Sequence, residues 1–160
     1  MAIFSVIVLT APPPGLAAEA NGAFVKVDGR ESLLRAVELF LNRDQIQQIQ
    51  IVFTPEMLEE GKRKYGGHLS FSGVKVLSAG PKWIDQLAVA APKISDESTH
   101  VLIHDAARPA VVYSDIEAIL EAAEKHPAIA LAAPVRTSLA ELDEGGGAVA
   151  FHSPSRFMQL

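Results

Sequence analysis

The sequence predicts an α/β protein: a doubly wound, mainly parallel sheet with helices on both faces. Short apolar runs, typical of buried strands, alternate along the chain with segments whose apolar residues recur at helical spacing. Such a rhythm joins parallel strands through right-handed crossovers. The chain has 160 residues, of which 49% are hydrophobic, so it is long enough to bury a sizeable core. We therefore expect a single domain over residues 1–160.

The chain begins with a strand, a loop, a helix and a second strand. Ile3–Leu9 is an apolar run and is expected to form the first buried strand. The loop Thr10–Ala23 contains three consecutive prolines and cannot be helical throughout, because proline lacks an amide donor. From Ser32, apolar residues recur at helical spacing and predict a helix with one buried face. Ile46–Phe53 predicts the second strand, since apolar residues alternate there with glutamines.

Two helices flank the predicted third strand. Thr54-Pro55 suits the N-cap and first position of a helix, and Gly66-Gly67 is expected to end it. Val74–Leu77 is the short third strand. The next helix contains Trp83, which is expected to be a core residue, and ends at Pro92.

The remaining elements follow the same rhythm and then weaken. Thr99–His104 is expected to be the central strand. Ser114–Glu117 has the pattern of a capping box and predicts the next helix. Ala128–Ala133 is apolar and is expected to add a strand. A polar arm at residues 137–152 follows, with a short closing strand predicted at Ala148–Phe151.

Charge and composition restrict the function. The net charge of −5 argues against nucleic-acid or membrane partners, so a polyanionic ligand would need a locally positive pocket. The chain has no cysteine, which fits a cytoplasmic protein, and its histidines lack the spacing of a zinc site. The apolar start, Ala2–Leu9, is too short to cross a bilayer and has no preceding basic residue.

The most informative segment lies at the end of the central strand. The apolar run stops at His104-Asp105, and Arg108 follows just before a proline. Ligands of open α/β sheets bind at the carboxyl ends of the strands, so Asp105 and Arg108 are candidates for holding a metal ion and a phosphate. A structural ion pair is the alternative interpretation. Strand alternation turns His104 away from Asp105, which favours a packing role for it.

This segment, His-Asp-Ala-Ala-Arg-Pro, resembles the 2-C-methyl-D-erythritol 4-phosphate cytidylyltransferases of the non-mevalonate isoprenoid pathway. The likeness covers nearly the whole chain in order and spacing. It includes Ile3–Thr10, Phe24, Asp28–Arg30, Leu33–Phe40, Ala79-Gly80, Val101–Pro109, Ala132–Arg136, Ser153-Pro154 and Phe157. The resemblance implies a Rossmann-like nucleotidyltransferase fold. The expected reaction transfers CMP from CTP to 2-C-methyl-D-erythritol 4-phosphate or a related sugar-alcohol phosphate.

The resemblance also implies residue roles. Asp105 and Arg108 would be catalytic, with Asp105 holding Mg²⁺ and Arg108 contacting the substrate phosphate together with Arg136 and Ser138. The nucleotide would contact residues from separate loops, namely Thr10, Ala11, Gly15, Ala79, Gly80 and Ala106. CTP and a sugar-alcohol phosphate would be the small-molecule partners. A homodimer is expected, with residues 137–152 as a shortened arm.

Departures from the family fall at the expected triphosphate site. The family's first loop is rich in glycine and carries a lysine, whereas here Pro12–Pro14 fill the loop and Gly22 stands at the lysine's place. Leu16 and Trp83 stand at or near family arginines. These changes remove donors and cations that stabilise phosphoryl transfer, unless Lys26, Arg30 or Lys82 replaces them. Two hypotheses follow: a cytidylyltransferase-like enzyme, or a catalytically degenerate nucleotide-binding, phosphate-binding or interaction module of the same fold.

Overall fold

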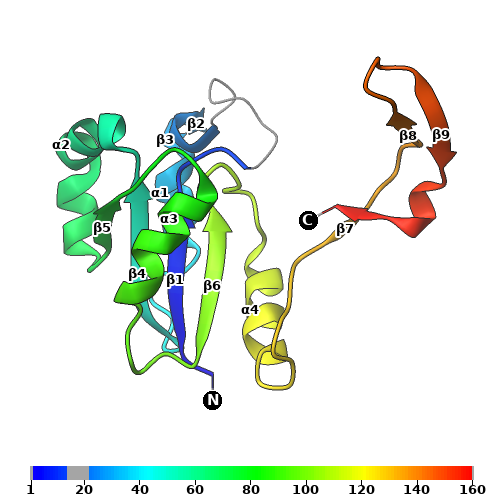
Figure 1. Cartoon of the computed structure of the whole chain (residues 1–160). Helices are drawn as coiled ribbons and strands as arrows, with labels where there is room; N and C mark the ends of the chain where they lie inside the picture. Colours follow the sequence, from blue (N-terminus) through cyan, green and yellow to red (C-terminus); the bar gives the residue numbers. More distant parts are fainter. Residues whose placement is uncertain (1, 14–21, 160) are drawn as a thin grey trace.

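The computed structural model describes residues 2–13 and 22–159. At its centre is a four-stranded parallel sheet in the order β5–β4–β1–β6 (Figure 1). The strands are β1 (Phe4–Leu9), β4 (Ile46–Phe53), β5 (Lys75–Ser78) and β6 (His100–Asp105). The helices are α1 (Ser32–Glu38), α2 (Pro55–Phe71), α3 (Trp83–Ala90) and α4 (Tyr113–Ala122). The predicted parallel α/β sheet is confirmed.

Helices cover both faces of this sheet because β1 is apolar on both. Val6 and Val8 belong to a core cluster that includes buried residues of α1, α2 and α4. Ile7 and Leu9 point to the opposite face, where they form a second cluster with residues of α3. The sheet therefore has three helices on one face and α3 on the other, as a doubly wound fold requires.

The predicted end of the second helix is wrong. We expected Gly66-Gly67 to end it, but α2 continues through both glycines to Phe71. Tyr65 and Leu69, on either side of the glycine pair, are buried in the core and hold the helix in place. Burial of these side chains outweighs the cost of about 1 kcal/mol for each glycine in a helix. The turn into β5 comes at Gly73, which has a positive φ of 70°.

The predicted start of the fourth helix is two residues too late. The sequence suggested a capping box at Ser114–Glu117, whereas α4 begins at Tyr113 with Val112 as its N-cap and no side-chain capping bond. Val112 has extended backbone angles, which suit the residue that enters a helix. The pattern at Ser114 does not set the start, because the chain already enters the helix from extended backbone at Val112.

The strand predicted at Ala128–Ala133 is also wrong. Most of that segment is exposed and lies outside the central sheet. Only β7 (Ala133–Pro134) is a strand, and it pairs antiparallel with β10 (Met158–Gln159). An apolar run forms a strand only where another strand accepts its main-chain hydrogen bonds, and β6 pairs with β1 alone among the described residues.

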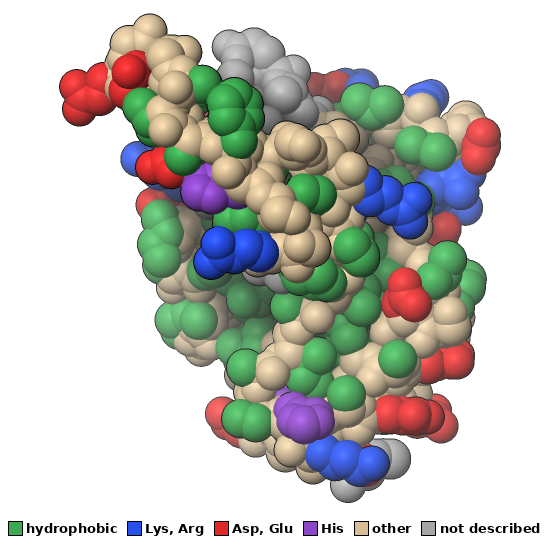
Figure 2. Space-filling view, turned by 90° about the vertical axis from the view of Figure 1, so that its right-hand side faces the viewer, with side chains coloured by type: hydrophobic (Ala, Val, Ile, Leu, Met, Phe, Trp, Pro, Cys, Tyr) green, Lys and Arg blue, Asp and Glu red, His purple; other side chains and the backbone are tan. Residues whose placement is uncertain are grey.

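Two short antiparallel hairpins in the described ranges lie outside the central sheet. The arm is an antiparallel pair of β8 (Leu139–Leu142) and β9 (Ala148–His152), which confirms the closing strand predicted at Ala148–Phe151. It projects away from the sheet (Figure 1). Near the first loop, β2 (Lys26–Val27) pairs with β3 (Arg30–Glu31). Figure 2, viewed from the side of α4 and the arm, shows hydrophobic side chains spread over this face.

In the described ranges, single-turn 3₁₀ helices lie at Gly22–Phe24, Ala91–Lys93 and Pro154–Arg156. None of the helices in the described ranges combines the length and hydrophobicity needed to cross a bilayer. Trp83, expected in the core, is half-buried and packs against the second core cluster.

Candidate functional site

The candidate site lies where β1 and β6 end side by side. The parallel register pairs Leu9 with Asp105, so the first loop leaves the sheet beside the segment that follows Asp105. The amide of Ala106 donates to the carbonyl of Leu9 at 2.9 Å and continues this contact beyond the strands. The carboxyl edge of the sheet therefore brings together two loops that are almost 100 residues apart in the sequence.

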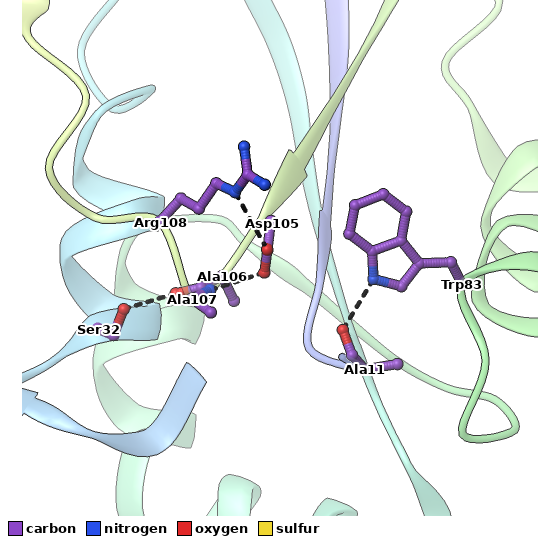
Figure 3. Close-up of polar contacts among 7 residues, drawn as sticks. All are labelled: Ala11, Ser32, Trp83, Asp105, Ala106, Ala107 and Arg108. Atoms are coloured by element: carbon purple, nitrogen blue, oxygen red, sulfur yellow. Dashed lines mark hydrogen bonds and ion pairs between the residues drawn. The ribbon is translucent and has the colours of Figure 1, made fainter. Parts of the chain in front are cut away.

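A tight turn brings Asp105 and Arg108 together. Asp105 Oδ1 accepts the main-chain N–H of Ala107 at 2.9 Å, and the Asp105 carbonyl accepts the N–H of Arg108 at 3.0 Å. The turn places Arg108 Nε 3.6 Å from Asp105 Oδ2 (Figure 3). The Asp105 side chain is only 6% exposed, whereas that of Arg108 is 53% exposed. The acid is therefore held in place, and the guanidinium reaches into solvent.

Burial shifts the pKa values of the two buried titratable groups of the site, Asp105 and His104, in opposite directions. Burial raises the pKa of Asp105, although the Ala107 N–H and the charge of Arg108 act in the opposite direction. Burial lowers the pKa of His104 from 6.5 to about 4, so this imidazole is neutral at pH 7. The His104 ring packs edge-on against Phe40 with centroids 5.2 Å apart, in agreement with the predicted packing role.

The segment after Asp105 is anchored by the start of α1. Ser32 Oγ, at the start of α1, donates to the carbonyl of Ala106 at 2.7 Å (Figure 3). Both Ser32 and Ala106 are buried. A Cβ built on Gly22 would lie 3.2 Å from the Cβ of Ala107, so a larger residue at position 22 would press against this segment. Gly22 stands where the resembling family has a lysine, and here the position serves close packing.

The first loop begins with two buried residues that α3 holds. Thr10 Oγ1 donates to the carbonyl of Val52 at 2.7 Å, which ties the loop to β4. The main chain of Thr10 and Ala11 is bonded to the side chains of Gln86 and Trp83. Gln86 was not predicted as a functional residue, and its only signal in the sequence is a glutamine on the side of α3 that faces the sheet. Gly15, a predicted nucleotide contact, lies outside the described residues.

The end of β5 contributes a third loop at the same sheet edge. The N–H of Ala79 donates to the carbonyl of Phe53 at 3.0 Å. A Cβ built on Gly80 would lie 2.6 Å from Asp85 Oδ2, which itself accepts the N–H of Lys82 at 3.3 Å. A larger residue at position 80 would therefore force the Asp85 side chain to move from the loop. Ala79 and Gly80 thus end a strand at the sheet edge that also carries Asp105.

A cleft of about 640 Å³ opens from this edge along β6. Pro13, Trp83, Asp105 and Arg108 line it at the loop end, and the segment 126–131 forms its far wall. The outer edge of β6 faces the cleft, because β6 pairs with β1 alone in the described part of the chain. The cleft therefore has a polar end at Asp105 and Arg108 and an apolar wall along β6.

The other predicted phosphate contacts lie elsewhere. Arg136 and Ser138 are exposed on the stretch between β7 and β8 and do not line the cleft. Lys26 pairs with Glu31, and Arg30 with Glu38, instead of reaching the cleft. Lys82 does not line the cleft either, so none of the three cations considered as replacements reaches it in this structure.

A parallel sheet with Rossmann-like topology, whose carboxyl edge presents an acid and a guanidinium beside the first loop, defines a nucleotidyltransferase-like α/β protein. The comparison with protein families agrees with this class. The chain belongs to the 2-C-methyl-D-erythritol 4-phosphate cytidylyltransferase family, whose model matches residues 5–156.

Individual relatives carry the same name. The enzyme of Frankia casuarinae is 29% identical over 122 residues, which cover 76% of this chain and 44% of the relative. That of Haemophilus ducreyi is 28% identical over 137 residues, or 83% of this chain and 58% of the relative. The chain thus spans about half the length of these curated relatives.

A solved structure supports the fold. The 4-diphosphocytidyl-2C-methyl-D-erythritol synthase of Anaerococcus prevotii superposes with a TM-score of 0.77 at 16% identity, covering 99% of this chain and 66% of that one. Almost every residue here therefore has a counterpart in that fold.

Proposed function

We propose that this chain carries out cytidylyl transfer from CTP to 2-C-methyl-D-erythritol 4-phosphate. The observation that carries the proposal is the pairing of a fixed, buried carboxylate with a half-exposed guanidinium at the carboxyl end of β6, 3.6 Å apart. Family membership supports this reaction, and the geometry at the end of β6 supports Asp105 and Arg108 as its residues. A phosphate oxygen of the acceptor attacks the α-phosphorus of CTP, the bond to the β-phosphate oxygen breaks, and pyrophosphate leaves.

Asp105 and Arg108 have different tasks in this proposal. Arg108 is long and exposed, so its guanidinium can turn toward a phosphate and bind two of its oxygens. Asp105 lines the cleft and is fixed by the Ala107 N–H through Oδ1, which leaves Oδ2 beside Arg108. Positioning of this kind is the main source of catalysis in phosphoryl transfer.

A divalent cation, with Mg²⁺ the expected ion, belongs to this proposal. Mg²⁺ usually binds one or two carboxylates together with substrate phosphates. No group of three or more metal-binding side chains occurs among the described residues, so a cation shared between Asp105 and the triphosphate fits the donor set. When bound, the cation neutralises charge on the phosphates.

Turnover with CTP, MgCl₂ and 2-C-methyl-D-erythritol 4-phosphate, followed by pyrophosphate release, tests the function. We expect Asp105→Asn to lower kcat by about 100-fold or more, because it removes a preorganised charge at the reacting centre. Asp96→Asn is the matched control, since Asp96 is exposed and does not line the cleft. Absence of pyrophosphate release by the wild-type protein at high concentration would overturn the proposal.

A further inference from the structure

Two side chains of α3 take up three main-chain groups at the start of the first loop. Gln86 Oε1 accepts the N–H of Thr10 at 3.1 Å and the N–H of Ala11 at 3.3 Å. Trp83 Nε1 donates to the carbonyl of Ala11 at 2.8 Å (Figure 3). Gln86 and Trp83 are three residues apart on one helix, so they present to the loop from the same side. They form a clamp, which we define as the side chains of Trp83 and Gln86.

The clamp is buried where it holds the loop. Gln86 is 0% exposed, and Thr10 and Ala11 are each 1% exposed. Water therefore cannot replace the Gln86 acceptor if it is removed, and two buried N–H groups would lose the same partner at once. The loop start and the first turn of α3 are consequently fixed to each other.

Packing alone does not explain a glutamine at this position. The Nε2 atom of Gln86 is buried and has no hydrogen-bond partner among the described residues. An unpaired buried amide carries a free-energy cost that a methionine or leucine of similar size would avoid. The cost is offset here because Oε1 accepts two main-chain N–H groups, so the carboxamide serves the loop rather than the core.

The clamp also determines what the loop can offer a ligand. Main-chain N–H groups after a strand are common donors to phosphates, yet those of Thr10 and Ala11 already donate to Gln86. Trp83 lines the cleft together with Pro13, Asp105 and Arg108, whereas Gln86 does not. Thr10 and Ala11 do not line it either, so Gln86 can affect a ligand in the cleft only through Trp83 and through Pro13, which follows the two residues that it holds.

We propose that Gln86 and Trp83 are positioning residues for the nucleotide: they hold Thr10–Ala11 in place, and with them Pro13 at the cleft where CTP binds, without Gln86 touching CTP. This inference rests on the proposed function and deepens it. The loop that the resembling family fills with glycine is held here by side chains from a neighbouring helix. Affinity for CTP thus depends on a residue outside the cleft.

Four variants separate positioning from bulk packing. Gln86→Met keeps the length but removes the acceptor, and Gln86→Glu restores an acceptor for both N–H groups. Trp83→Phe keeps a ring on the cleft wall but removes the donor. Ile84→Ala is the control, because Ile84 lies on the same helix and is 68% exposed.

Two readouts are needed, hydrogen exchange at the Thr10 and Ala11 amides without ligand, and KM and kcat with CTP. In Gln86→Met we expect exchange at both amides and KM for CTP to rise about tenfold or more, with kcat nearly unchanged. Gln86→Glu should recover most of both effects. Trp83→Phe should raise KM for CTP with little change in kcat, and Ile84→Ala should match wild type. A purely structural role would lower thermal stability without this selective rise in KM.

Each result decides the proposal. A folded Gln86→Met protein with wild-type exchange at both amides, or with wild-type KM for CTP, overturns it. If Gln86→Met does not fold, Trp83→Phe decides, and an unchanged KM for CTP overturns the proposal. If the wild-type protein neither binds nor uses CTP, the proposed function fails and the nucleotide part of this inference with it. The exchange data would then still show whether the clamp holds the loop.

Discussion

We expect the fold to lose stability as the pH falls from neutral toward 5, with His104 responsible for most of the loss. His104 is 9% exposed, and its Nε2 atom has no hydrogen-bond partner among the described residues. Protonation would place a charge in this buried position without hydration. Burial therefore lowers the pKa of His104 to about 4, assisted by the positive charge of Arg108 and opposed by a hydrogen bond to the Arg108 main chain.

The sign follows from proton linkage. In the unfolded chain His104 has its ordinary pKa of 6.5, so between 6.5 and about 4 the unfolded state binds more protons than the folded state. Lowering the pH through this window favours unfolding. From about pH 7.5 to about pH 5 the loss in free energy of unfolding is about 2 kcal/mol, and well below pH 4 it approaches about 3 kcal/mol.

Asp105 acts in the opposite direction at lower pH. Its pKa is raised from 3.8 by burial, so the folded state takes up its proton more readily than the unfolded state. The resulting stabilisation is present at acid pH and is lost as the pH rises through the raised pKa. The effect of His104 is therefore best measured on the neutral side of its window.

Urea unfolding at several pH values, in wild type and in His104→Gln, measures this effect. We expect the variant to lose most of the decrease of about 2 kcal/mol between pH 7.5 and pH 5. His126→Gln is the matched control, because it removes an exposed imidazole. If His104→Gln shows the same pH dependence as wild type, burial of His104 does not control acid stability and the reasoning is wrong.

Further predictions concern the site and the core. Arg108→Ala should raise KM for the sugar-alcohol phosphate by about 10- to 100-fold, because a charged hydrogen bond to the phosphate is lost. Arg63→Ala, at an exposed position, is the control and should leave this KM unchanged. The same KM in Arg108→Ala as in wild type would contradict the role of Arg108. Chelation of divalent cations with EDTA should abolish pyrophosphate release, and readdition of MgCl₂ should restore it. Ser32→Ala should lower the free energy of unfolding by about 1–3 kcal/mol, because the buried Ala106 carbonyl loses its donor; urea unfolding would refute this if the midpoint stayed unchanged. Phe53→Ala should lower the free energy of unfolding by about 3–5 kcal/mol in the same measurement, since this side chain of β4 is fully buried and packs against α2.

The sequence was sufficient where local pattern and tertiary environment agree. The bounds of β4 match the prediction residue for residue, β1 begins one residue later than predicted, and β6 both begins and ends one residue later. β1 and most of β6 are apolar runs, and β4 alternates apolar residues with glutamines before its apolar end. The Asp105–Arg108 pair was also predictable, because both residues belong to one short turn after a strand.

The sequence was insufficient where distant contacts decide the structure. The glycine pair in α2 signals a helix end, yet burial of Tyr65 and Leu69 against the sheet carries the helix through it. Ala128–Ala133 is apolar enough for a strand, but whether a neighbouring strand accepts its hydrogen bonds is not a local property. Gln86 was missed for the same reason, since its partners lie about 75 residues away in sequence.

The structural and functional interpretations of the Asp105–Arg108 pair can both hold under the proposed function. Arg108 is the only lysine or arginine among the described residues that line the cleft, and CTP with a phosphorylated acceptor brings several negative charges to it. The contact of 3.6 Å through Nε is longer than a strong charged hydrogen bond, and the guanidinium is half-exposed. Separating the pair therefore costs little free energy once Arg108 contacts a phosphate and Asp105 contacts a cation. The ion pair of the free protein then holds two groups ready that the bound state uses separately.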